Sequence, residues 1–261
     1  MKLNIPRLAA SAVLSIGVLF TLAGQSDGAI VEGFETTTLN STNSIGDASI
    51  RSGNYFGIAP TDGTHQLLLT TISTVAAHDP GPNQSGTNAV SVSSLAAFLG
   101  VSTSSIRDGT VTGQEGSAFQ LSLGTVAAGT TISFKYDFLT NEVQPGAHND
   151  FAFITLTGMS GNTPVVSDTL RPLFPTTGVG NPFVLNTLYQ TYSFTVATAG
   201  IYTLGIGIVD GTTTDTSSAL LVDSINVPDS GSSFVLLGIS LLTVAGLRRS
   251  VSRGMATAAL S

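Results

Sequence analysis

The chain has no cysteine and no tryptophan, and only 10% of its 261 residues are charged. The lack of cysteine excludes disulfides, thiolate zinc sites and a cysteine nucleophile. The lack of tryptophan removes the best side chain for stacking on a sugar ring. The scarcity of Lys and Glu argues against a surface made of charged helices. We therefore expect strands and turns to dominate, held by burial and hydrogen bonding.

Positive charge is especially scarce in the middle of the chain. Between residues 30 and 229 the sequence has fifteen carboxylates and four cations, a net charge of −11; the cations are Arg51, Arg107, Lys135 and Arg171. Phosphate binding requires a concentrated cationic surface, so nucleic acid is excluded as a partner. An acidic body favours solubility and leaves divalent cations as an alternative role for the carboxylates.

The first residues have the order of a secretory signal. Lys2 and Arg7 precede an apolar run over 8–23, and small and polar residues follow up to Ala29. This order predicts a signal peptide over 1–29, recognised by the Sec machinery and removed by signal peptidase. The alternative is a retained N-terminal anchor, but the run is short and no cationic flank follows it.

The last residues predict a membrane anchor. A polar box over 227–233 is followed by an apolar stretch over 234–247, a basic stop over 248–253 and a short tail over 254–261. Fourteen helical residues cover roughly 21 Å, so spanning a hydrocarbon core of about 30 Å needs a thinned bilayer. The positive-inside rule places the basic stop in the cytoplasm and the body outside. A buried core helix is the alternative.

This tail resembles the PEP-CTERM class of sorting signals, in the variant with a Val-Pro-Asp-Ser-Gly box. The resemblance implies that an exosortase, a membrane-embedded protease or transpeptidase, cuts near the box and relocates the body to the cell surface or extracellular space. Pro228 and Gly231 favour an extended, accessible segment, although a plain linker would look similar. Carried over residue by residue, the implied signal comprises Val227, Pro228, Asp229, Ser230 and Gly231, with Arg248 and Arg249 behind the apolar stretch.

Between the two ends, a body over 30–226 shows the period-two alternation of strands. Residues 119–123 and 132–138 alternate most clearly and predict an antiparallel pair with one buried face. Residues 91–107 predict one or two short helices interrupted by Gly100. The fold class is therefore all-β, an antiparallel two-sheet β-sandwich of jelly-roll-like type with a short helical insertion. Further strands are expected at 30–34, 48–51, 65–71, 150–157, 164–170, 191–196, 201–209 and 219–227.

The body also resembles the jelly-roll domains of PEP-CTERM proteins, some of which are akin to carbohydrate-binding modules. The segments that carry this resemblance are 33–35, 46–50, 138–142, 149–153 and 220–225. It implies a structural calcium where the first and last strands meet, with Glu35 and Asp223 as ligands. The alternative is a turn acid and a solvated strand acid.

A second group of oxygen-bearing side chains brackets a short loop between two expected strands. It comprises Asn141, Glu142, Asn149 and Asp150, whose oxygens are of the kind that suits calcium. Asn and Asp are equally ordinary in loops, where they bond to their own backbone. Glu142 and Asp150 are therefore the second pair of calcium candidates, and no other cofactor is expected.

The sequence has no convincing catalytic pattern. Residues 24–28 match Gly-x-Ser-x-Gly, but they lie at the predicted signal-cleavage site instead of between a buried strand and a helix. The three histidines lack metal-motif spacing, so we expect no enzyme. Ring-bearing candidates for a sugar platform are Tyr55, Phe56, Tyr189 and Tyr192. The sequence thus predicts an exported, non-catalytic surface or matrix protein; the alternative is a calcium-supported carbohydrate-binding module with extracellular polysaccharide as its partner.

Overall fold

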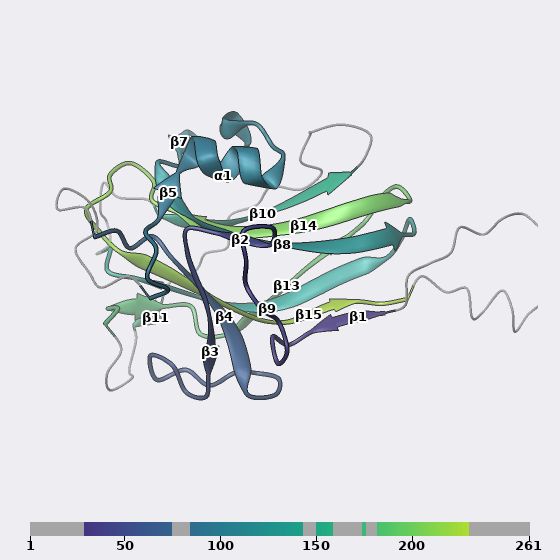
Figure 1. Cartoon of the computed structure of the whole chain (residues 1–261), viewed down its shortest axis with the longest axis horizontal. Coiled ribbons are helices and arrows are strands. Elements are labelled where there is room, and N and C mark those ends of the chain that lie inside the picture. The colour runs from purple at the N-terminus through teal and green to yellow at the C-terminus, as the bar shows by residue number, and fades with distance from the viewer. Residues whose placement is uncertain (1–28, 75–83, 143–149, 159–173, 176–181, 230–261) are drawn as a thin grey trace, which may run out of the picture.

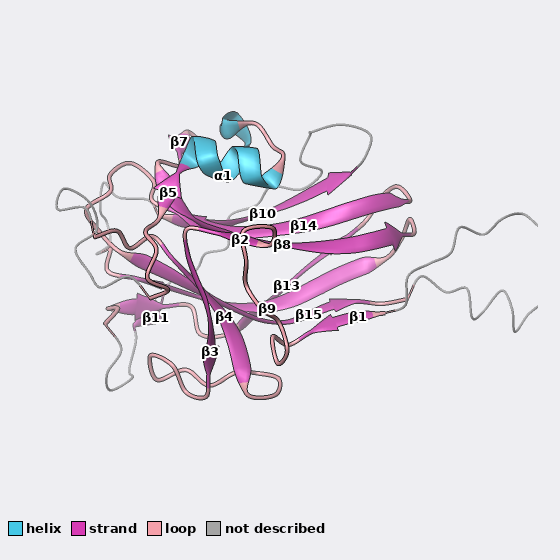
Figure 2. Cartoon of the chain, viewed as in Figure 1, coloured by secondary structure: helices cyan, strands magenta, loops and turns pink. Residues whose placement is uncertain are grey.

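The computed structural model describes residues 29–74, 84–142, 150–158, 174–175 and 182–229. Two antiparallel sheets pack face to face, and strands make up most of this part of the chain (Figures 1 and 2). The prediction of an all-β fold with antiparallel sheets is confirmed. The predicted signal peptide, the strand at 164–170 and the C-terminal anchor lie outside the described residues. Among the helices that are described, none is long and apolar enough to cross a membrane.

The first sheet is built around the last strand of the body. Its order is β11-β12-β9-β15-β4-β3, with β1 also paired to β15 and β13 also paired to β9. The strands are β1 (Ile30–Glu32), β3 (Asp47–Ser52), β4 (His65–Thr70), β9 (Thr131–Thr140), β11 (Phe174–Pro175), β12 (Leu185–Asn186), β13 (Gln190–Thr195) and β15 (Ser218–Val227).

The second sheet has the order β10-β14-β8-β2, with β5 also paired to β8. Its strands are β2 (Ser44–Ile45), β5 (Val90–Ser91), β8 (Glu115–Val126), β10 (Phe151–Gly158) and β14 (Gly200–Val209). Successive long strands therefore alternate between the two sheets from β4 to β15. A small separate ribbon pairs β6 (Arg107–Asp108) with β7 (Val111–Thr112).

The helical insertion lies where the sequence predicts it. Helix α1 (Val92–Leu99) begins at Ser91, whose hydroxyl accepts a hydrogen bond from the Ser94 N–H. It ends at Gly100, which has the left-handed conformation that glycine adopts without strain. A short 3-10 helix, η1 (Thr103–Ser105), follows. The helix covers the outer face of the second sheet, where Leu95 and Leu99 join a buried cluster with Phe151 and Phe153 (Figure 1).

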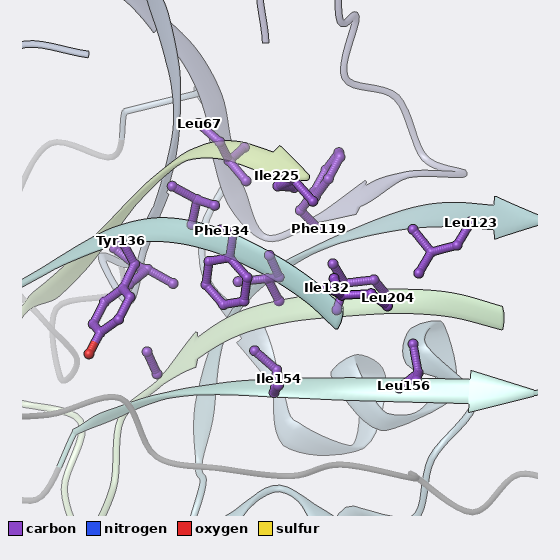
Figure 3. Close-up of a cluster of buried hydrophobic side chains, with 14 of the residues drawn as sticks. Leu67, Phe119, Leu123, Ile132, Phe134, Tyr136, Ile154, Leu156, Leu204 and Ile225 are labelled. Atoms are coloured by element: carbon purple, nitrogen blue, oxygen red, sulfur yellow. The ribbon is translucent and has the colours of Figure 1, made fainter. Parts of the chain in front are cut away.

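The predicted pairing of residues 119–123 with 132–138 is wrong. These residues form β8 and β9, which lie in opposite sheets and pair with β14 and β15 instead. The alternation does identify the buried face of each strand, because Phe119 and Leu123 of β8 meet Ile132 and Phe134 of β9 in one core (Figure 3). The apolar faces meet across the sandwich. The two strands therefore do not form a hairpin, and the turn between them connects one sheet to the other.

The first sheet is buried on both faces, whereas the alternation of apolar and polar residues predicts strands with one buried face. Leu67 and Leu69 of β4 point into the main core, while Leu68 belongs to a separate cluster on the other side with Leu139 and Leu221. Loops over 53–64 and 182–189 supply the residues that cover this outer face. The three consecutive leucines of β4 are all fully buried for this reason.

The segment after β1 is fixed to the core by Phe34. Its ring is buried and meets Phe119 of the opposite sheet edge to face, with 5.5 Å between ring centroids. We expect Phe34→Ala to lower the free energy of unfolding by about 3–5 kcal/mol, because it removes a buried ring and leaves a cavity. The exposed Val31 provides a matched control, and Val31→Ala should stay within about 0.5 kcal/mol of the unmodified chain in urea unfolding. Equal losses in the two variants would contradict this packing.

Candidate functional site

Three of the four ring candidates come together on the outer face of the first sheet. Tyr55 and Phe56 lie in the loop before β4, and their ring centroids are 4.4 Å apart. Phe183, which the sequence did not single out, packs edge to face on Phe56 at 5.3 Å. Tyr189 joins the same cluster. Tyr192 does not, because it lies on β13 against Phe134, at the margin of the main core.

Part of this aromatic cluster is accessible to solvent. Tyr55, Phe56 and Tyr189 are half-buried, and the neighbouring segment exposes 56% of Val184 and 58% of Leu188. Leu188 also has a φ of 53°, a backbone conformation that is uncommon for a residue other than glycine. The cluster formed by Tyr55, Phe56, Phe183 and Tyr189 is called the aromatic patch below. It offers partly accessible rings on the outer face of the first sheet.

The hydroxyl groups of the aromatic patch are bonded within the protein. The Tyr189 hydroxyl donates to Gln66 Oε1 at 2.5 Å, and the Tyr55 hydroxyl donates to Gln84 Oε1. The Arg51 guanidinium lies 4.8 Å from the centre of the Tyr55 ring. Burial, followed by the negative charges of Asp223 and Asp137, raises the pKa of the Tyr189 hydroxyl above its usual range, so this group stays a neutral donor.

Asp137 lies beneath this patch and is fully buried, although alternation placed it on a solvent face. Its Oδ1 accepts a hydrogen bond from the Thr187 hydroxyl at 3.1 Å, and its Oδ2 accepts one from the Asn186 amide at 3.2 Å. Burial raises the pKa of Asp137 to about 6, against the lowering effect of these bonds. Among the described residues the buried Asn186 Oδ1 has no hydrogen-bond partner. A proton on Asp137 would supply that missing donor.

The first pair of calcium candidates, Asp223 and Glu35, binds opposite ends of the segment over 61–65. Asp223 Oδ2 accepts hydrogen bonds from the backbone N–H groups of Thr61 at 2.6 Å and Asp62 at 2.9 Å, and from the Thr61 hydroxyl at 2.8 Å. Glu35 Oε1 accepts from the N–H groups of Thr64 and His65 at 2.6 and 2.7 Å. Both carboxylates therefore hold the loop over 61–65 in place.

Glu35 is further stabilised as an anion. Its Oε2 lies 3.0 Å from His65 Nδ1, and it also accepts a bond from the Thr64 hydroxyl at 2.9 Å. The hydrogen bond with the His65 side chain, followed by those from the Thr64 and His65 backbone, lowers the pKa of Glu35 to about 2. A Cβ on Gly63 would lie 2.2 Å from Glu35 Oε1, so the carboxylate fits closely only against glycine.

These hydrogen bonds involve the same carboxylate oxygens that would have to bind a calcium ion. Calcium binds six to eight oxygen ligands, whereas N–H donors already point at the oxygens of Glu35 and Asp223. Within the described part of the chain, no three His, Asp or Glu side chains gather in a way that could hold a metal ion. Loop anchoring is thus the role that the geometry shows, and calcium binding at this pair stays a prediction.

The second pair of candidates does come together. Asp150 donates its backbone N–H to both carboxylate oxygens of Glu142, at 3.1 and 3.2 Å. Asp150 in turn accepts from the Gly211 N–H at 3.1 Å and from the Ser218 hydroxyl at 2.6 Å. Both acids are buried. Asn141 instead accepts from the Val184 N–H, and Asn149 lies outside the described residues.

The sorting box begins inside the folded body. Val227 is the last residue of β15, is only 5% exposed and belongs to the main core. Pro228 and Asp229 are exposed. Ser230, Gly231, Arg248 and Arg249 lie outside the described residues. The box is thus divided between a buried valine and an exposed Pro-Asp step.

Comparison with protein families identifies this segment. Residues 226–251 match the model of the VPDSG-CTERM motif. The prediction of a VPDSG-type PEP-CTERM sorting signal is confirmed, and the motif implies an exported protein that is sorted by an exosortase and associated with the cell surface. The match covers the C-terminal segment and leaves the body unassigned. A search of curated proteins finds no match.

Solved structures with a similar arrangement of strands share little sequence with this chain. The K1 cleaved adhesin domain of Lys-gingipain from Porphyromonas gingivalis W83 is 10% identical, with a TM-score of 0.40 over 78% of this chain and 100% of that domain. The CBM22-1–GH10 modules of a Clostridium thermocellum endo-1,4-β-D-xylanase, complexed with xylohexaose, are 10% identical, with a TM-score of 0.30 over 78% of this chain and 28% of theirs. At these scores the likeness carries no argument about function.

The buried Asp137 predicts an unusual pH dependence. A carboxyl whose folded pKa lies above its unfolded value favours folding when protonated, so the free energy of unfolding should fall as pH rises from about 4 to about 6. The shift from 3.8 to about 6 corresponds to about 3 kcal/mol. Asp137→Asn should remove this slope and stabilise the body at pH 7, because the new amide can donate to a rotated Asn186. Urea unfolding between pH 4 and pH 7 measures the effect.

The exposed Asp215 serves as the matched control, because Asp215→Asn removes one carboxylate without touching the buried site. The slope between pH 4 and pH 6 should survive in this variant. A slope that is the same in Asp137→Asn as in the unmodified chain would show that Asp137 is not its source.

Proposed function

We propose that this chain, which carries the VPDSG-CTERM motif, is an exported, non-catalytic cell-surface or extracellular-matrix protein, anchored by its C-terminal segment and then processed by an exosortase-like system. The observation that carries the proposal is the position of the motif, which starts at Asn226 in the last strand of the body. The folded body ends where the sorting signal begins. The proposed order is export, folding of the body, anchoring and processing.

The arrangement of the two ends supports this order of events. Strand β1 pairs with β15, and Ile30 lies directly opposite Val227 (Figure 1). The predicted signal peptide ends at residue 29 and the predicted anchor follows the box, so both attach at the same end of the paired strands β1 and β15. Removal of both segments would leave β1, β15 and the core that they close intact.

The uses of the carboxylates support a non-catalytic role. Asp47 accepts hydrogen bonds from the backbone N–H groups of Gln84 and Ser85, and Asp223 accepts from those of Thr61 and Asp62. In both cases a buried acid fixes a loop that is distant in sequence. Such acids hold the fold together and are shielded from a substrate.

Intact-mass measurement of the protein from its own host tests the proposal. We expect the mature species to lack residues 1–29 and the apolar stretch over 234–247. In a host strain without the sorting enzyme, the C-terminal stretch should be retained and the body should stay in the membrane fraction. A full-length species in the cytosol would contradict export, and C-terminal loss in the absence of the enzyme would contradict sorting.

A carbohydrate-binding module that is supported by calcium is the second candidate, and the aromatic patch is the observation that favours it. Stacking of a sugar on a partly accessible ring would place it on Tyr55 or Phe56. The hydroxyls of Tyr55 and Tyr189 are bonded internally, which orients the rings but reduces the donors left for a sugar. In this reading calcium would stabilise the fold at one of the carboxylate pairs described above.

A glycan array with the purified body tests the second candidate. If the aromatic patch binds sugar, Tyr55→Ala should lose at least tenfold in apparent affinity, because truncating an aromatic side chain that anchors a ligand costs about 2 kcal/mol or more. Ile201→Ala alters an exposed residue of β14, in the other sheet, and should bind as the unmodified body does. Melting with and without a chelator tests calcium separately, since a ligand of the folded state raises the midpoint. No sugar bound, together with an unchanged midpoint, would remove this candidate.

A further inference from the structure

The last three residues of β15 are held between two other strands. Ile225 and Val227 pair with Glu32 and Ile30 of β1, and Asn226 pairs with Ser133 of β9 on the other side. The side chains of Ile225 and Val227 are buried in the main core, where Ile30 packs against them. The end of β15 is therefore an inner strand with apolar anchors, although it borders the sorting signal.

Strand β1 is itself fixed to the body. Glu32 Oε1 accepts a hydrogen bond from the Phe34 N–H at 2.5 Å, and the Phe34 ring is buried against Phe119 of the second sheet. Opening the β1–β15 pair would thus expose Ile30 and Val227 and strain a connection to the core. Ile225 and Val227 are withheld from solvent by side-chain burial. The side chain of Asn226 is exposed, and its backbone is held in the strand ladder between β1 and β9.

The sheet ends abruptly after Val227. Pro228 has no backbone N–H, so it cannot extend the ladder with the residue that precedes β1. Pro228 and Asp229 are both exposed. A protease binds its substrate as an extended segment whose backbone groups are available, and local unfolding is the route to such a segment inside a folded sheet. The first residue that meets this requirement without unfolding is Pro228.

We propose that the folded body sets the upstream limit of processing: Val227 serves the fold, the sorting enzyme reads the box from Pro228 onward, and the cut falls on the C-terminal side of Pro228 or further along the chain. This inference rests on the proposed function and refines the boundary of its processing site. Hydrolysis would break one peptide bond after Pro228 or a later residue, with hydroxyl from water added to the carbonyl carbon and a proton to the departing nitrogen. The mature body would then keep β15 whole, including its pairing with β1.

The C-terminal peptide of the mature protein, identified by mass spectrometry after isolation from the host, measures this limit directly. We expect every mature species to end at Pro228 or beyond. A mature C-terminus at Val227 or earlier overturns the proposed limit while leaving sorting intact. A chain that keeps the residues after Arg249 overturns both the limit and the proposed function, so the two failures are distinguishable.

Matched substitutions test whether Val227 acts through the fold. Val227→Thr changes a residue of the box, and Ile225→Thr makes the same kind of change two residues earlier, on the same face of β15 and outside the matched segment. Both variants should lower the melting temperature, and the folded fraction of each should be cut at the same bond as the unmodified chain. Val227→Ile, which keeps an apolar side chain in the core, should restore the melting temperature.

The outcomes separate two readings of Val227. If the enzyme reads this side chain, processing of folded Val227→Thr would fall at least tenfold while Ile225→Thr remained a substrate, and the proposal would be wrong. If neither threonine variant folds, Val227→Ile still decides the question, because its processing within twofold of the unmodified chain is expected and a tenfold loss overturns the proposal.

Discussion

Strand β15 is the element on which the rest of the structure depends. It pairs with β1, β4 and β9, which are separated from one another along the chain and are brought into one sheet by this strand. Its inner face supplies Leu220, Val222 and Ile225 to the main core, and its outer face supplies Leu221 beneath the aromatic patch. The sorting box begins at the end of this strand. The same strand therefore stabilises the body and contains the first residue of the signal.

Carboxylates take the structural role that disulfides have in many exported proteins. Asp223 joins the end of the body to the loop at Thr61, 162 residues away, and Asp150 reaches Gly211 across 61 residues. Hydrogen bonds to an ionised group are stronger than neutral ones, and each of these contacts connects segments that are distant in sequence. A chain without cysteine thus ties its loops to its sheets with backbone N–H groups and acids.

Two features of the protein are candidates for a function, the aromatic patch and the sorting box, and they are formed by different parts of the chain. The aromatic patch is formed by loops over 53–64 and 182–189, which cover the outer face of the first sheet and bury Asp137. The sorting box starts at Val227, the last residue of β15, which pairs with Ile30 of the first strand. The patch needs a ligand to have a function, whereas the box is matched by a known sorting motif. For that reason sorting is the stronger basis for a function.

Several features followed from the sequence alone, because they depend on local chemistry. Gly100 ends a helix because glycine accepts a left-handed backbone, and period-two alternation locates β9, β10, β13 and β14 nearly to the residue. The VPDSG box is likewise a local pattern, and its five consecutive residues identify it without any knowledge of the fold.

Tertiary structure decided which faces meet and which polar groups are covered. Alternation shows that β8 and β9 each have an apolar face, but it cannot say whether the faces share a sheet or meet across a core, and here they meet across the core. Asp137 looked solvated because the loop that buries it lies some fifty residues further along the chain. Glu35 and Asp223 each bind backbone N–H groups of the segment over 61–65, and these N–H groups carry no sequence signature. Contacts of this kind arise from folding at long range, which local residue patterns do not encode.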